Sequence, residues 1–483
     1  MRGAGVLMMA AMLAKAGNLL SMIVLARVLL PLEIGGFAMA LALVVILAKC
    51  ANFESRRDII RDPAKAAAKA KAYLLVQGVL ALGLSLLVHF ASASLVSVWS
   101  EIALWDSAST HLVGSLLTAL ALIPLLEALT LPAVGLVESR MMFRAAAILE
   151  IAAIFTQAGL AILLALIGYG VWALVIGIYA GMTLRLLVSW SLVASTLIRA
   201  RIDRESLRSV FGFGTTMLLS MLIGTAAMNV PEILAGGSLG LAAAGIYKYA
   251  YMLPHAAEQV IQHLGRVSLA MLGKHPDPKQ QGRVFSITTR FSLSVLMPGI
   301  VLGLPHAEAL VGLILGDRWL AAADPLRVLI VLIVMRAGLV HWRDVATIQG
   351  RCDFFLKTSL ATFVCMLLIS VPLMGSFGVL GMAWATLLSW ALPLPFLLVW
   401  LRRVLRIRLG PVFGPSLIAG ALALSLGMLV SWLLPGTGRS LLLALMAAQM
   451  LVYVVALLRL DPELSSLIRA EFLKRGSPRI PAK

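Results

Sequence analysis

Charged residues are scarce in this chain of 483 residues: Asp, Glu, Lys and Arg together make up 13% of it, about half the fraction usual for soluble domains. Hydrophobic residues make up 61%, and the mean hydropathy is +0.99. These values exclude a soluble globular protein, a disordered chain and a nucleic-acid-binding module. Because one bilayer-spanning helix takes about 20 apolar residues, a dozen or more spans fit into the sequence. The composition therefore predicts an all-α polytopic membrane protein.

Cysteine is almost absent as well. Cys50, Cys352 and Cys365 sit in or beside apolar segments without metal-ligand spacing, which indicates small buried side chains and neither a disulfide framework nor a metal site. The zinc-binding HExxH motif and the P-loop of nucleotide-binding proteins are missing, and we expect no cofactor. Without an ATP-binding motif, any energy that the protein uses must come from ion gradients, the membrane potential or consumption of its product.

Apolar runs separated by short polar breaks predict fourteen membrane spans. The breaks carry Gly and Pro, as in GYG at 168–170, GSFG at 375–378 and PGTG at 435–438. The N-terminal run is too long for a signal-peptide core and contains Lys15, so it is predicted to remain as the first span. The predicted spans are 5–28, 34–53, 72–98, 111–131, 145–167, 170–196, 211–235, 244–272, 286–315, 324–349, 356–375, 378–401, 413–434 and 440–458.

Positive charges gather in every second loop. Loops after even-numbered spans, together with Arg2 and the C-terminal tail, hold 29 of the 40 Lys and Arg, and the net charge is +18. Loops after odd-numbered spans hold only Arg27, Arg318, Arg327 and Arg439. Since Lys and Arg accumulate in cytoplasmic loops, both termini are predicted to be cytoplasmic and the number of spans to be even.

Three pairs of segments indicate an internal repeat. Leu29 to Ala40 (LLPLEIGGFAMA) aligns with Leu239 to Ala250 (LGLAAAGIYKYA) at an offset of 210 residues, which places Gly35 on Gly245. GYGVWAL at 168–174 aligns with SFGVLGM at 376–382 at an offset of 208, and SRMMF at 139–143 aligns with GRCDF at 350–354 at 211. Three matches in the same order at nearly constant offset predict a duplicated bundle of six spans.

The predicted architecture is two pseudo-symmetric six-helix lobes plus two C-terminal helices around a central cavity. Six spans per copy keep both copies in one orientation, so the pseudo-axis should run along the membrane normal. Two parallel bundles that can rock against each other are the architecture of a transporter. The predicted parts are an N-lobe at 1–200 (spans 1–6), a C-lobe at 201–405 (spans 7–12), two additional spans at 406–460 and a basic cytoplasmic tail at 461–483.

Several of these segments resemble one known family. The similar segments are LARVLLPLEIGGFAMA, which leads into the second span, IIRDP after that span, and SRMMFRAAAILE followed by GYGVWALVIG. In them the chain resembles the polysaccharide transporter family, the Wzx-type oligosaccharide flippases of the multidrug/oligosaccharidyl-lipid/polysaccharide superfamily. The resemblance implies alternating access in the cell (inner) membrane and a lipid-diphosphate-linked oligosaccharide as substrate. It also implies basic residues lining the cavity, at no fixed motif positions. One departure is Asn52-Phe53-Glu54-Ser55, where the family more usually has a small, glycine-containing apolar turn.

Ionisable residues inside predicted spans are candidates for the cavity, because a charge facing lipid is costly. Lys15 lies near the middle of span 1, with Asn18 one turn further on the same face. The alternative for residues near span ends, such as Lys49, Lys248 and Arg290, is that the side chain snorkels to the membrane surface. The predicted substrate-binding residues of this group are Lys15, Asn18, Lys49, Arg185 and Arg336.

Span 8 carries a polar stripe at helical spacing, interrupted by Pro254, which could kink the helix. A stripe facing lipid would be untenable, so it is predicted either to line the cavity and meet sugar hydroxyls or to form a hydrogen-bonded packing seam. Its residues are Tyr247, Tyr251, His255, Glu258, Gln262 and Arg266, with Gln259 alongside.

The acidic residues of the spans allow two readings. A membrane carboxylate can carry a proton or a cation and so couple transport to an ion gradient, or it can pair with a buried base. The candidates for ion coupling are Glu150, Glu232 and Glu258, with Glu127 a further intramembrane acid.

The sequence favours a flippase for a polyprenyl-diphosphate-linked oligosaccharide over three competitors. A cation-coupled drug exporter of the same superfamily would need acidic and aromatic cavity residues, whereas intramembrane Lys and Arg are prominent here. A membrane glycan polymerase or ligase is disfavoured because the predicted external loops are short and the aspartates stand singly. The third alternative is a structural partner in an export complex. Expected partners are the lipid-linked substrate, membrane lipids and glycan polymerase or export machinery, with no nucleic acid.

Overall fold

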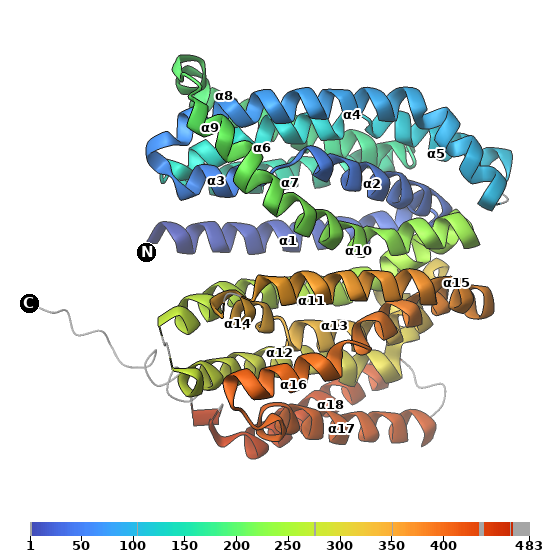
Figure 1. Ribbon diagram of the computed structural model, residues 1–483. Helices are drawn as coiled ribbons and strands as arrows, with labels where there is room; N and C mark the ends of the chain where they lie inside the picture. The colour runs from blue at the N-terminus through green and yellow to red at the C-terminus, as the bar shows by residue number, and fades with distance from the viewer. Residues whose placement is uncertain are drawn as a thin grey trace, which may run out of the picture. The chain divides into compact units, whose positions relative to one another are not determined.

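The computed structural model describes residues 2–103, 105–274, 277–349, 351–433, 439–463 and 465–466, and within these ranges the secondary structure is entirely helical (Figure 1). Every predicted span coincides with a helix or with two consecutive helices. The helices are α1 (Arg2–Val28), α2 (Pro31–Ala51), α3 (Ser55–Arg61), η1 (Pro63–Lys65), α4 (Ala66–Ala103), α5 (Ser107–Leu120), α6 (Ile123–Ser139), α7 (Phe143–Leu166), α8 (Trp172–Arg199), α9 (Arg204–Ser209), η2 (Val210–Gly214), α10 (Thr215–Leu239), α11 (Leu241–Lys274), α12 (Pro278–Ile314), η3 (Asp317–Ala322), α13 (Ala323–Gly338), α14 (Trp342–Ile348), α15 (Cys352–Ala391), α16 (Leu394–Leu405), α17 (Leu409–Leu433) and α18 (Arg439–Leu460).

Nine helical segments of the described residues are long and apolar enough to cross a membrane, which identifies a multi-pass membrane protein. Some predicted spans are not among these nine segments, and for two of them, α11 and α13, the physical reason is plain. Polar side chains interrupt the apolar surface of α11, and α13 is only 16 residues long. The total of fourteen spans stays a prediction. The nine segments are Pro31–Arg61, Pro63–Glu101, Ser107–Ser139, Phe143–Leu166, Trp172–Arg199, Pro278–Ile314, Lys357–Leu405, Leu409–Val430 and Leu443–Leu460.

Packing divides the chain into two units, each with its own core. Unit 1 is Met1–Tyr249 with Gly312–Ala321 and Leu367–Met382, and unit 2 is Ala250–Val311 with Ala322–Met366 and Ala383–Lys483. Unit 1 includes α10, which lies beyond the predicted lobe boundary at residue 200 and packs along α2. The division into lobes at 1–200 and 201–405 is inferred from the internal sequence repeat, and it stays a prediction.

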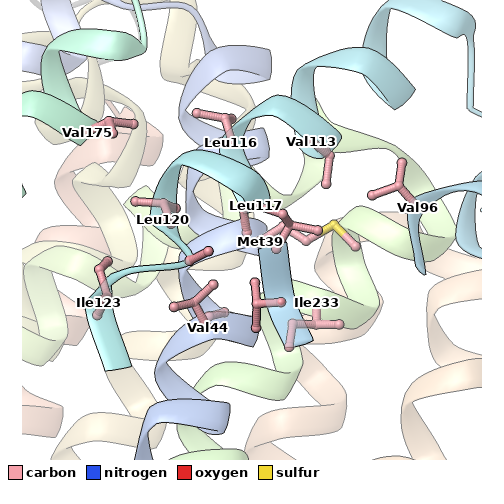
Figure 2. Packing of buried hydrophobic residues seen from close by; sticks show 14 of the residues in the cluster. Met39, Val44, Val96, Val113, Leu116, Leu117, Leu120, Ile123, Val175 and Ile233 are labelled. Atoms are coloured by element: carbon pink, nitrogen blue, oxygen red, sulfur yellow. The ribbon is translucent and has the colours of Figure 1, made fainter. Parts of the chain in front are cut away.

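The core of unit 1 forms where α2, α4, α5, α6, α8 and α10 meet. Figure 2 shows Met39 beside Leu117 and Ile233, with the side chains of α5 above them. Leu116, Leu117 and Leu120 of α5 are each 2% exposed or less. α10 comes close to α2 at Gly236, where an added Cβ atom would lie 2.7 Å from the sulfur of Met39, so that side chain would have to shift.

The core of unit 2 joins α11, α12 and α13 to the two C-terminal helices. Leu293 and Met297 of α12 pack with Ala419 and Ala423 of α17, all buried. The hydroxyl of Tyr453 on α18 donates a hydrogen bond to the Ser294 carbonyl oxygen at 3.0 Å. The additional helices predicted at 406–460 are therefore an integral part of the unit 2 core.

The repeat is visible in the backbone at two aligned glycines. Gly170, before α8, has φ +54°, and Gly378, which the repeat places on it, has φ +58°. Only glycine adopts this left-handed region freely. Gly378 interrupts α15 at the predicted break at 375–378, so α15 holds two predicted spans joined at a kink.

Two helices begin with aspartate caps that lie outside the membrane-crossing segments. Asp106 caps α5 by accepting a hydrogen bond from the Ser109 amide at 3.0 Å, and Asp203 caps α9 through the Ser206 amide at 2.8 Å. Hydrogen bonds from these serines hold the pKa of each aspartate carboxyl below its ordinary value. The Asn52–Ser55 segment, which departs from the family pattern, turns at Glu54 with φ +51°.

Candidate functional site

The polar stripe of α11 surrounds an arginine within unit 2. Arg336 of α13 donates one hydrogen bond to the Tyr251 hydroxyl at 2.9 Å and one to a carboxylate oxygen of Glu258 at 3.0 Å. The side chains of Arg336 and Glu258 are only 8% and 4% exposed. An ion pair this deeply buried has given up most of its hydration, so each partner depends on the other for its charge to be tolerated.

Two further α11 residues extend the cluster around this pair. His255 contacts Glu258, with Nδ1 3.4 Å from the second carboxylate oxygen, and its Nε2 lies 2.9 Å from the Gln259 side-chain nitrogen. The His255 ring also stacks on Tyr251, with centroids 5.1 Å apart. Because residues 251, 255 and 258 succeed one another at helical spacing, they present one face of α11 to Arg336.

An aromatic ring and a second arginine complete what we call the Arg336 cluster, namely Tyr251, His255, Glu258, Gln259, Arg336, Arg343 and Trp390. The Arg336 guanidinium lies 4.9 Å from the ring centroid of Trp390, in the geometry of a cation–π contact. Arg343 of α14 is exposed and close enough to repel Arg336 and attract Glu258. Asp344 also attracts Arg343, so the cluster places a second guanidinium and a second carboxylate within electrostatic reach of the buried Arg336–Glu258 pair.

Two residues of the predicted stripe cannot be placed in this cluster. Gln262 and Arg266 lie on α11, but their side chains are outside the part of the chain that the structure describes. Tyr247, at the start of the stripe, is 2% exposed and belongs to unit 1.

Three predicted intramembrane bases of unit 1 each contact an acid. Lys49 of α2 lies 2.6 Å from Glu127 of α6, Arg185 of α8 lies 2.8 Å from Glu150 of α7, and Lys248 of α11 lies 2.7 Å from Glu232 of α10. With Arg336 and Glu258, all three candidates for ion coupling are thus partners of a base. Their roles in substrate binding and ion coupling stay predictions.

Lys15 and Asn18 lie on α1, which packs along α7. The Lys15 side chain is half-buried, whereas Asn18 is exposed. Residues at positions i and i+3 lie on the same face of a helix, so Lys15 and Asn18 share one face of α1, as the sequence predicts.

A carboxylate that sequence reasoning did not single out organises the end of α3 in unit 1. Asp58 is completely buried and accepts hydrogen bonds from Lys69 at 3.1 Å, Tyr73 at 3.0 Å and Ser209 at 2.5 Å. These donors come from α4 and from α9, so one side chain holds three helices together. In sequence Asp58 is one of several single aspartates, and its donors are 11 to 151 residues away.

Replacing Asp58 by alanine is expected to destabilise the protein by about 3–5 kcal/mol, because the Lys69 ammonium, 5% exposed, would lose its main buried counter-charge. Thermal unfolding in detergent measures the change. The matched control is Asp62→Ala, since Asp62 is 36% exposed and lies 3.5 Å from the same ammonium, and a pair of that kind is worth about 0–1 kcal/mol. Equal unfolding temperatures for the two variants would contradict the assignment of Asp58 as a structural hub.

The part of the chain that the structure describes assembles no metal centre. It contains no group of three or more His, Cys, Asp or Glu side chains that could hold a metal ion. Gly236 to Gly240 reads Gly-Gly-Ser-Leu-Gly and matches the GxSxG pattern of serine hydrolases, a match that the sequence analysis missed. Ser238 lies in the last turn of α10 and not on a strand-to-helix elbow, so the context that gives the pattern its chemistry is missing.

The fold is shared with membrane transporters of known structure. The lipid II flippase MurJ in an inward closed conformation superposes with a TM-score of 0.72, covering 95% of this chain and 99% of that chain at 14% identity. An inward-facing multidrug resistance MATE family transporter of the MOP superfamily superposes with a TM-score of 0.68, covering 81% and 94% at 14% identity. At these identities the likeness establishes a polytopic transporter fold.

The sequence places the chain within a particular family. Residues 24–324 match the family model described as "Polysaccharide biosynthesis protein", and the chain belongs to that family. The teichuronic acid biosynthesis protein TuaB of Bacillus subtilis (strain 168) is 26% identical over 153 residues, which are 31% of this chain and 32% of the relative. This match thus spans about a third of the curated relative. The polysaccharide family predicted from the sequence segments quoted above is confirmed.

Proposed function

We propose that the protein flips a polyprenyl-diphosphate-linked oligosaccharide from the cytoplasmic to the outer leaflet of the cell (inner) membrane by alternating access, for exopolysaccharide, capsule or O-antigen biosynthesis. Membership of the polysaccharide biosynthesis family and a fold shared with a lipid II flippase support this proposal. The observation that carries it is the Arg336 cluster, in which a buried guanidinium–carboxylate pair lies beside Trp390 and within electrostatic reach of a second arginine.

A diphosphate cannot cross hydrocarbon without a replacement for its hydration shell. Guanidinium and ammonium groups can replace that shell, because they form charge-assisted hydrogen bonds to phosphate oxygens, and arginine does so in a bidentate manner. In this proposal Arg336, Arg343 and Lys15 supply such groups. Trp390 and Tyr251 offer rings on which a sugar can stack.

In this proposal the carboxylates neutralise the basic residues of the substrate-free protein. Glu258, Glu150 and Glu127 neutralise Arg336, Arg185 and Lys49 while no substrate is bound, so that no isolated charge is buried. An incoming diphosphate competes with the carboxylate for its base. A carboxylate displaced in this way becomes free to take up a proton, which is how an ion gradient could be coupled to the cycle.

The lipid tail of the substrate would remain in the bilayer while only the headgroup passes through the protein. No bond is made or broken in this process, so the protein is proposed to act as a transporter and not as an enzyme. Both termini are proposed to be cytoplasmic, as the distribution of Lys and Arg predicts. A glycan polymerase or export complex would be the partner that consumes the flipped product.

A flipping assay in proteoliposomes tests the proposal. A polyprenyl-diphosphate oligosaccharide in the outer leaflet is exposed to an added glycosidase, and the fraction of headgroup that has become inaccessible is followed over time. Protein-dependent redistribution is the expected result. Vesicles without protein and vesicles with heat-inactivated protein are the controls.

The fold shared with a multidrug transporter supports a second candidate, a cation-coupled exporter of small cationic molecules. The same proteoliposomes distinguish the two. Export of cationic dyes under an imposed ion gradient, with no redistribution of any lipid-linked glycan, would overturn the flippase and establish the exporter.

A further inference from the structure

The internal repeat brings its own equivalent residues into contact at one place in unit 1. α2 meets the start of α11 at Gly35 and Gly245, which are equivalent at the offset of 210 residues. A Cβ atom added to Gly35 would lie 1.7 Å from the Leu241 carbonyl oxygen, and one added to Gly245 would lie 2.1 Å from the Pro31 carbonyl oxygen. Pro31 and Leu241 are separated by the same 210 residues. Equivalent residues touch in this reciprocal way where a two-fold axis passes between them.

Two tryptophans make a second reciprocal pair of contacts in the same unit. The indole nitrogen of Trp105, between α4 and α5, donates a hydrogen bond to the Gly236 carbonyl oxygen on α10 at 3.0 Å. The indole nitrogen of Trp319 in η3 donates to the Ala26 carbonyl oxygen on α1 at 2.7 Å. Ala26 and Gly236 are again 210 residues apart. Each repeat thus places one tryptophan on the end of the first helix of the other repeat.

Further contacts surround Trp319 of η3 and the end of α1. Trp319 is completely buried, and its ring centroid lies 4.2 Å from that of Tyr249. The Tyr249 hydroxyl donates to the Met22 carbonyl oxygen at 3.0 Å, and Arg27 donates to the Leu313 carbonyl oxygen at 2.5 Å. The hydrogen bonds of Tyr249 and Arg27 both join the first repeat to the second.

The contacts share one side of the predicted topology. They lie at the junction of α1 and α2, between α4 and α5, at the junction of α10 and α11, and in η3 after α12. These four places are loops after odd-numbered spans, or the helix ends beside such loops. Since these loops carry few of the Lys and Arg residues, the predicted topology places the contacts on the non-cytoplasmic side of the membrane.

We propose that Gly35 and Gly245, together with the contacts Trp105–Gly236 and Trp319–Ala26, form the external gate of the transport pathway, which we call the two-fold clasp. The glycines let the backbones of α2 and α11 touch at the pseudo-axis, and the tryptophans hold the first helix of each repeat against the other. Outward opening requires both indole hydrogen bonds to break. The purpose of the clasp rests on the proposed function, whereas its opening can be measured without any substrate.

The test measures whether the clasp excludes external reagents. Cys50, Cys352 and Cys365 are replaced by serine, and Ala26→Cys, at a position that is 0% exposed, becomes the only thiol. A membrane-impermeant maleimide is added from the outside of intact cells, and the labelling rate is followed. Gly245→Leu is expected to raise this rate at least about tenfold, because the open state of a two-state protein is typically a minor population of about 0.1–10%. The control is Gly83→Leu, because a Cβ atom at Gly83 meets nothing within 4 Å.

Variants at the tryptophans test the two-fold character of the clasp without adding bulk. Trp105→Phe and Trp319→Phe each remove one indole donor, so each should raise the labelling rate, and the double variant should raise it further. Trp172→Phe, at an exposed tryptophan of α8, is the matched control. Unchanged labelling in Gly245→Leu and in the double variant, with wild-type unfolding temperatures, would overturn the clasp. Faster labelling in a protein that flips no glycan lipid would leave the clasp intact and refute only the proposed substrate.

Discussion

Replacing Lys15 by alanine is expected to lower the rate of lipid-linked oligosaccharide flipping by about 10- to 100-fold. A hydrogen bond to a charged group contributes about 1.5–3 kcal/mol, and about 1.4 kcal/mol corresponds to a factor of ten. Lys15 is half-buried on α1, where an ammonium has few competing water molecules. Alanine is the best helix former, so α1 itself should persist. The initial rate of headgroup redistribution in proteoliposomes measures the effect.

Two further variants make the Lys15 result specific. Lys15→Arg keeps the charge and should retain most of the activity. Lys65→Ala removes an exposed lysine that pairs with Glu205, and it should flip at the wild-type rate. Wild-type flipping by Lys15→Ala, at equal amounts of reconstituted protein, would remove Lys15 from the binding site.

Removing the Glu258 carboxylate is expected to destabilise the protein by about 3–5 kcal/mol, because the buried Arg336 guanidinium would keep its desolvation cost without its ion-pair partner. Thermal unfolding in detergent should show a large fall for Glu258→Ala. The double variant Glu258→Leu with Arg336→Met should recover most of the loss, since a buried ion pair replaced by apolar side chains of similar volume is often close to neutral.

The control for this ion pair is Glu205→Ala. Glu205 is 69% exposed and pairs with Lys65, so its removal should change the free energy of unfolding by about 0–1 kcal/mol. If Glu258→Ala unfolds at the same temperature as Glu205→Ala, the Arg336–Glu258 pair is not structural. A double variant that is less stable than Glu258→Ala would show that Arg336 contributes through other contacts, such as that with Trp390.

The helices could be predicted from the sequence because an apolar run of about 20 residues that crosses a bilayer forms a helix, in which the backbone groups satisfy one another's hydrogen bonds. Even the interruption of α15 was predicted, since Gly378 aligns with Gly170 and both need a left-handed backbone. The total number of spans was harder to establish. α11 carries too many polar residues to meet a criterion of apolar length, although it lies where span 8 was predicted.

The candidate site could be predicted only as a set of charged residues without their partners. Lys49 and Glu127 are 78 residues apart, and so are Glu258 and Arg336. Which base meets which acid depends on helix packing, which hydropathy does not describe. Arg343 is not among the predicted site residues, and Trp390 has no charge that would single it out in the sequence. The two tryptophans of the clasp are 214 residues apart, a shift of four from the repeat offset, and simple alignment of the repeat does not match them.

The acid–base pairs also matter for how the chain enters the bilayer during synthesis. Arg185 and Glu150 lie on the consecutive helices α7 and α8, and Lys248 and Glu232 lie on the consecutive helices α10 and α11. A helical hairpin that inserts as one unit therefore carries no net charge at these positions. A single helix would have to insert each charge without its partner, which costs about 2.5–3.5 kcal/mol at a helix centre and less near a helix end. Because each acid and its base lie on consecutive helices, we expect each pair of helices to insert into the bilayer together, with the two charges already paired.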